Sequence, residues 1–206
     1  MTSTQSNAFR TTACEIALVA APLMLTAADL FRQADQIAVG EVLAKVAVAF
    51  FVPVVFELVR LTRARAALAS LFGLTLCIIG LLNVATVSTV TSVRWSLLHA
   101  GLAPGAQETV ERTLNSVLQF AALFPLPAPA FAVGLVVLII ALYRTGVTSR
   151  LLALSVLVGA ILFPIGRIGG IPALILASDM ALIIGLAPLA FKELRRTWAD
   201  NQLLAG

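Results

Sequence analysis

The stretch Ile171–Phe191, IPALILASDMALIIGLAPLAF, decides the fold class of this chain. A membrane-spanning helix needs about 20 apolar residues, and this run has that length. Asp179, near its middle, is its only ionisable residue. A charge at the centre of a bilayer costs at least about 2.5 kcal/mol. We therefore expect Asp179 to face other helices or a wet cavity, or to be protonated.

The composition of the whole chain agrees with a membrane protein. Of its 206 residues, 60% are hydrophobic and 12% are charged, whereas soluble domains have about 25% charged residues. The length allows about six spans with short loops and leaves no room for a separate soluble domain. We predict one all-α membrane domain, residues 1–206, with transmembrane helices at about 12–28, 38–60, 66–90, 125–143, 151–168 and 171–191.

The first apolar run has two interpretations. It could be a cleaved signal peptide, with Arg10 as the charged region and Thr26-Ala27-Ala28 before the cut. Glu15, near the front of the run, argues against a signal peptide. We therefore expect a retained first helix, followed by a short polar turn over residues 29–36.

Residues 106–124 are less hydrophobic than the spans. Their apolar side chains recur at helical spacing between charged and amide residues, which predicts an amphipathic helix. It could lie on the outer face of the membrane or extend the fourth span. Prolines at 125, 127 and 129 break the helix and favour the first arrangement. We expect residues 94–104, which include His99, to form a loop before it.

Basic residues are divided unevenly between the two sides of the predicted bundle. With a cytoplasmic N-terminus, nine of the 14 lysines and arginines fall on cytoplasmic segments and four on outer ones, while Lys45 lies within a span. Cytoplasmic loops carry such an excess. We expect both termini in the cytoplasm of a multi-pass protein of the bacterial inner membrane. Because this orientation accounts for the net charge of +4, we expect no nucleic acid partner.

Metal and cofactor sites lack ligands in this sequence. Cys14 and Cys77 are the only cysteines, they form no C-x-x-C motif, and His99 is the only histidine. Thiolate zinc sites, bis-histidine haem and thioredoxin-like redox pairs need more such residues. We expect neither a metal nor a cofactor, and no structural disulfide.

The turn Leu142-Tyr143-Arg144-Thr145-Gly146, followed by Arg150-Leu151-Leu152-Ala153, resembles a family of bacterial integral membrane proteins known as domain of unknown function 4386. That family places a similar turn and helix start between two late spans, and Leu81-Leu82-Asn83 also fits its third span. Ser149 departs from the family, which has proline there, as does the proline-rich segment before the fourth span. The resemblance implies a six-helix membrane fold and no established activity.

Polar residues of several spans fall at a similar depth. At 1.5 Å per residue, Lys45, Asn83 and Asp179 all lie roughly 10–12 Å below the outer surface. Glu41 precedes Lys45 by four residues, which is the favourable order for a helical ion pair. We predict an intramembrane polar cluster of Asp179, Lys45, Glu41 and Asn83, with Arg167 above it, opening to the outer face. The alternative is that these residues neutralise one another and hold the helices in register.

Two further predictions concern residues outside this cluster. Glu57 lies three residues before Arg60 near the inner surface, so we expect an interfacial ion pair with Arg60 or Arg63. Four glycines inside the spans more simply allow close helix packing than bind a ligand: Gly80, Gly134, Gly159 and Gly185.

Three functions remain open from the sequence. The first is binding or moving a small solute, proton or lipid through the polar cluster, because intramembrane charges commonly mark such paths. The second is an intramembrane enzyme, an acid-catalysed isomerase or cyclase, with Asp179 as proton donor and Glu41 or Glu57 as second carboxylate. The third is a structural or accessory subunit. The expected partners are membrane lipids, a small lipophilic ligand, a second copy of the chain or another membrane protein.

Overall fold

The computed structural model describes the backbone of residues 3–101, 104–122 and 127–205, and the side chains of 13–101, 105–116 and 129–191. All regular structure in these ranges is helical, which confirms the all-α class. The seven helices are α1 (Ser3–Gln33), α2 (Ile37–Arg63), α3 (Ala67–His99), α4 (Pro104–Ala122), α5 (Pro127–Arg144), α6 (Arg150–Gly169) and α7 (Pro172–Ala205).

Within the described ranges, five helices are long and apolar enough to cross a membrane. They are residues 13–33 of α1, all of α2, α3 and α6, and residues 172–191 of α7. By length and composition, this is a polytopic membrane protein. The apolar part of α5, Pro129–Arg144, is shorter than these five.

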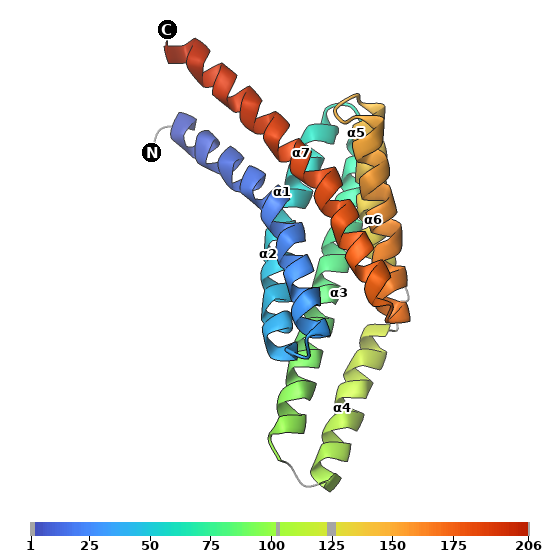
Figure 1. Cartoon of the computed structure of the whole chain (residues 1–206). Coiled ribbons are helices and arrows are strands. Elements are labelled where there is room, and N and C mark those ends of the chain that lie inside the picture. The colour runs from blue at the N-terminus through green and yellow to red at the C-terminus, as the bar shows by residue number, and fades with distance from the viewer. Residues whose placement is uncertain (1–2, 102–103, 123–126, 206) are drawn as a thin grey trace.

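The bundle has two distinct ends (Figure 1). Both chain termini lie towards the end where the α2–α3 and α5–α6 turns are found, and the C-terminal part of α7 projects beyond it. We call it the basic end, because its arginines are Arg60, Arg63, Arg65, Arg144 and Arg150. The α1–α2 and α6–α7 turns lie at the other end, which we call the cluster end after the charged side chains described below. Helices that follow one another through these turns therefore run antiparallel.

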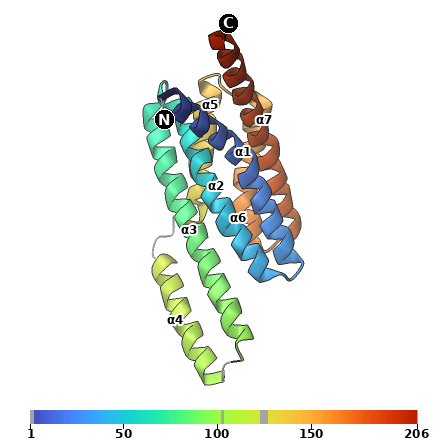
Figure 2. The same cartoon turned by 90° about the vertical axis from the view of Figure 1, so that its left-hand side faces the viewer.

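Helix α3 extends beyond the α1–α2 turn, and α4 returns beside its projecting part (Figures 1 and 2). The prediction of a loop over 94–104 is wrong for residues 94–99, which continue helix α3 to His99. Ser and Thr hydroxyls in this polar stretch donate to carbonyls of their own helix. Ser96 Oγ, for example, donates to Ser92 O at 2.9 Å. The hydrogen-bonding needs of these hydroxyls are thus met within the helix, and the helix is not interrupted.

Helix α4 confirms the predicted helix over residues 106–122, and residues 123–124 of that prediction lie outside the described backbone. Its position relative to the membrane stays a prediction. Helix α4 runs antiparallel to α3 along the bundle axis (Figure 2). Leu97 and Leu98 of α3 line the seam with Val110 and Leu114 of α4. The described part of the apolar stripe of α4 therefore packs against α3.

Helix α5 lies among α2, α3 and α6 and forms much of the core. Its Phe131 ring packs edge-to-face against Phe51 of α2 at 5.1 Å and against Phe163 of α6 at 5.6 Å between ring centres. A Cβ atom on Gly80 of α3 would lie 2.2 Å from the Phe131 nitrogen. Only glycine permits this approach of α3 and α5. The predicted packing role is confirmed here and equally for Gly134, Gly159 and Gly185.

Candidate functional site

Four helices bring charged side chains together at the cluster end. Helices α1 and α2 meet there because Asp35, with a φ of 61°, turns the chain sharply between them. Helices α6 and α7 meet there because Gly170, with a φ of 62°, ends α6 in the left-handed conformation that glycine accepts freely. The two turns place five residues at one level, which we call the charged cluster: Asp29 and Arg32 of α1, Glu41 of α2, Arg167 of α6 and Asp179 of α7.

Arg167 joins three of these helices. Its Nη2 donates to Asp179 Oδ1 at 3.0 Å and also to Asp29 Oδ2. The guanidinium carbon lies 4.0 Å from the centre of the Phe163 ring, in cation–π contact. Arg167 is thereby held between α1, α7 and the aromatic core.

Arg32 connects the remaining members. Its Nε donates to Glu41 Oε1 at 2.9 Å, and its Nη1 donates to Asp29 Oδ1 at 2.8 Å. Asp29 thus receives hydrogen bonds from both arginines. The cluster is one continuous chain of ion pairs that begins at Glu41 on α2 and ends at Asp179 on α7.

The carboxylates of the cluster are almost fully buried. Their residues expose 0% (Asp179), 3% (Glu41) and 4% (Asp29) of their surface, whereas the two arginine side chains expose 21–29%. Three buried atoms of the cluster have no hydrogen-bond partner among the described residues: Asp179 Oδ2, Glu41 Oε2 and Arg167 Nη1. With all groups ionised, three carboxylates face two guanidinium groups. The cluster then carries one negative charge in excess.

The structure brings Asp179, Arg167 and Glu41 of the predicted cluster together and leaves two residues out. Lys45 Nζ donates to Ser92 Oγ of α3 at 2.9 Å, so the expected contact between Lys45 and Asp179 is wrong. Depth along the helix was estimated from the sequence, but the direction in which Lys45 points around the α2 axis was not. Asn83 is half-buried on α3 and takes no part in the hydrogen bonds of the cluster.

Sequence reasoning missed Asp29 and Arg32, which it assigned to a polar turn. A signal was present in the sequence: a charged pair spaced three apart, Asp29 and Arg32, is suited to a helix. Extending the first span to Gln33 would have placed both residues opposite Glu41 across the turn, at the same level.

Glu57 lies at the basic end, away from the cluster. Its carboxylate accepts hydrogen bonds from Arg60 at 2.5–3.0 Å, which confirms the expected ion pair with Arg60. Along α2, Glu57 is about 24 Å from Glu41, at 1.5 Å per residue. Glu57 and Asp179 therefore do not share one site, so the structure does not bring Glu57 to Asp179 as a second carboxylate.

The described side chains contain no group of three or more His, Cys, Asp or Glu residues placed to hold a metal ion. Cys77 is buried between α3 and α5, where its Sγ lies 3.9 Å from Phe131 O.

Comparison with protein-family models, curated proteins and solved structures gives no match for this chain. The resemblance carried by residues 142–153 stays a prediction. The case for function rests on the geometry of the charged cluster.

Proposed function

We propose that this membrane protein binds or moves a proton at the charged cluster. The observation that carries the proposal is the excess of one buried carboxylate over the guanidinium groups. A cluster that only holds helices together is most stable when its charges balance, because an uncompensated charge in a low-dielectric region is costly. A bound proton would restore the balance.

Asp179 is the member best suited to receive this positive charge. Asp29 already accepts hydrogen bonds from Arg32 and Arg167, whereas Asp179 accepts only one, from Arg167. Its second oxygen is buried with no partner in the described part of the chain. Glu41 also has a free oxygen, but it lies in the first turns of α2, where the helix dipole favours a negative charge.

Neutralising Asp179 would change which helices are held together. Arg167 would then be attracted mainly to Asp29 on α1, and the α6–α7 connection would weaken. Such an exchange of one arginine between two carboxylates could couple binding to a shift of α7. This is the step by which the site would move its ligand rather than only hold it.

The direction of the helices supports six membrane crossings with both termini on one side. Helices α3 and α6 both run from the basic end to the cluster end, so the chain must return between them, through α5. At 1.5 Å per residue, the 18 residues of α5 are about 27 Å long, close to the hydrocarbon thickness of about 30 Å. With the basic end in the cytoplasm, the charged cluster would lie near the outer face of the cell membrane.

A structural role is the second candidate, and one observation favours it. The ion pairs already join four helices, so the cluster can fix their register without any ligand. The two proposals differ in what happens when Asp179 loses its charge. For the enzyme hypothesis, Asp179 and Glu41 remain the candidate acids, and Glu57 lies too far from them to share their site.

Infrared difference spectroscopy of the protein in lipid nanodiscs tests the proposal. As the pH is lowered in the absence of Na⁺ and K⁺, a proton ligand should give the carbonyl stretch of a buried carboxylic acid. Asp179→Asn should remove this band, and Glu108→Gln on the exposed face of α4 should keep it. Absence of this band in the wild type, or its persistence in Asp179→Asn, would overturn the proposal.

A further inference from the structure

A second feature lies at the opposite end of the bundle, in the seam between α5 and α6. Its side chains form an apolar groove of about 280 Å³ between Ile140 of α5 and Leu154 and Leu157 of α6. Tyr143 and Arg150 stand at its mouth. The groove therefore has a polar, positively charged entrance and apolar walls.

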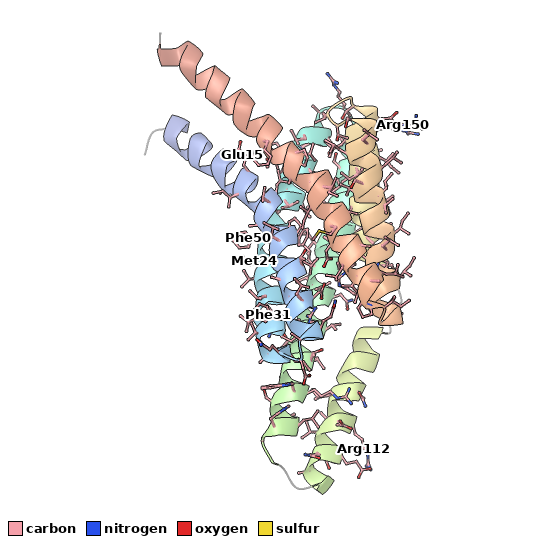
Figure 3. All side chains as sticks on the ribbon, in the orientation of Figure 1. Glu15, Met24, Phe31, Phe50, Arg112 and Arg150 are labelled. Atoms are coloured by element: carbon pink, nitrogen blue, oxygen red, sulfur yellow. The ribbon has the colours of Figure 1, made fainter. Side chains whose placement is uncertain are left out.

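The groove extends from the expected headgroup level into the hydrocarbon. Helix α5 ends at Arg144 and α6 begins at Arg150, so the entrance lies at the basic end (Figure 3). Leu157 lies seven residues further along α6, or about 10 Å deeper. Tyrosine and arginine are the residues that anchor proteins at the membrane interface. A molecule that fits this arrangement has an anionic head and an alkyl chain below it.

The charge at this entrance is not balanced by its own helices. Neither α5 nor α6 contains an aspartate or glutamate, and the stretch 112–178 has none. Two other grooves between described helices contain a carboxylate. Glu57 lines the α1–α2 groove together with Arg60, to which it is bonded, and Arg63, and Glu15 lines the α1–α7 groove. Among these three, the α5–α6 groove is the one whose described lining has a basic residue and no carboxylate, so charge complementarity favours an anion there.

We propose that the α5–α6 groove binds an anionic phospholipid, with its phosphate at Arg150 and Tyr143 and part of an acyl chain between Ile140 and Leu157. Basic pockets between transmembrane helices on the cytoplasmic side bind such headgroups. The site is far from the charged cluster, so it does not depend on the function proposed for Asp179.

Native mass spectrometry of the detergent-purified protein tests this site, with phosphatidylglycerol and phosphatidylcholine titrated separately. The wild type should bind phosphatidylglycerol more tightly. Arg150→Gln should weaken that binding about fivefold, as one basic residue near an anionic surface does, and leave phosphatidylcholine unchanged. Tyr143→Phe should give a smaller loss in the same direction. Arg150 is exposed, so its substitution leaves the packing of the bundle intact.

Two matched variants separate a built site from general attraction to positive charge. Arg112→Gln on α4, far from the groove (Figure 3), should bind phosphatidylglycerol like the wild type. Arg63→Gln removes a charge at the same end but outside the groove, and should have less effect than Arg150→Gln. Equal losses in Arg63→Gln and Arg150→Gln, or none in Arg150→Gln, would overturn the proposal. Displacement of the lipid by glycerol 3-phosphate alone would also overturn it, because a free phosphate ester would then suffice.

Discussion

The two ends of the bundle contain the same kinds of charged residue and arrange them in opposite ways. At the cluster end, carboxylates outnumber arginines, and every charged side chain of the cluster is bonded to another. At the basic end, arginines outnumber carboxylates, and the buried Glu57 is bonded to the half-exposed Arg60. The ion pairs of the cluster join four helices, whereas the arginines of the basic end lie at helix ends and in turns.

The difference between the two ends follows from how far the charged residues lie from the ends of their helices. Asp179 lies about two turns inside α7, and Asp29 and Glu41 each lie about one turn from the end of their helix, so the arginines must reach inward to pair with them. The arginines of the basic end lie on the last turn of a helix, on the first, or in a connection, where water reaches them. Charges that share a low-dielectric region are tightly coupled, and charges in water are not. Substitutions at the two ends should therefore differ in size.

The largest decrease in the free energy of unfolding is expected for Arg167→Gln. This change leaves Asp179 and Asp29 buried without their shared arginine, and breaking a buried pair typically costs about 3–5 kcal/mol. Chemical unfolding of the detergent-purified variant measures the change in the free energy of unfolding. Arg112→Gln, which breaks an exposed pair with Glu108, is the matched control. If the free energy of unfolding of Arg167→Gln falls no more than that of the control, the cluster is not more tightly coupled than an exposed ion pair.

A smaller loss is expected for Arg60→Gln at the basic end. Glu57 is buried, but 46% of the Arg60 side chain is exposed, so water partly replaces the missing partner. We expect the free energy of unfolding to fall by about 1–2 kcal/mol. The double variant Arg60→Gln/Glu57→Gln should recover most of this loss in the same unfolding experiment. Additive losses from the two substitutions would show that the pair is not coupled.

The smallest effect is expected for Arg65→Gln. Its Nη1 donates to Thr145 O at 2.8 Å and connects the α2–α3 and α5–α6 turns, but the contact is exposed. Exposed charged contacts contribute about 0.2–1 kcal/mol, and salt screens them. The melting temperature of Arg65→Gln should therefore fall slightly at low salt and match the wild type at high salt. A large, salt-independent decrease would mean that the two turns depend on this bond.

Much of the fold was predictable because it depends on apolar runs of membrane-spanning length. The runs ending at Arg60 and Phe191 correspond to α2 and to the spanning part of α7. Helix ends were less predictable where polar residues continue a helix, as in α3, whose serines and threonines bond to their own backbone. The position of α4 depended on the extra length of α3, which the sequence analysis had assigned to a loop.

The site was predictable only in part, for a geometric reason. Depth along a helix follows from residue number, and it placed Lys45, Asn83 and Asp179 near one level, of which Asp179 belongs to the charged cluster. Rotation about the helix axis follows from packing against neighbours, so Lys45 was assigned to the wrong partner. Asp29 was missed because the first span was ended at residue 28, one residue too early to include it.

The unfolding free energy of Asp179→Asn tests the central claim most directly. Asparagine keeps the shape and can still accept the hydrogen bond of Arg167, while the excess negative charge disappears. If the carboxylate is retained to bind a positive charge, Asp179→Asn should be neutral or stabilising, within about 1 kcal/mol of the wild type, and should partly rescue Arg167→Gln. A loss as large as that of Arg167→Gln would contradict the account, because Asp179 would then be a structural partner in a balanced ion pair.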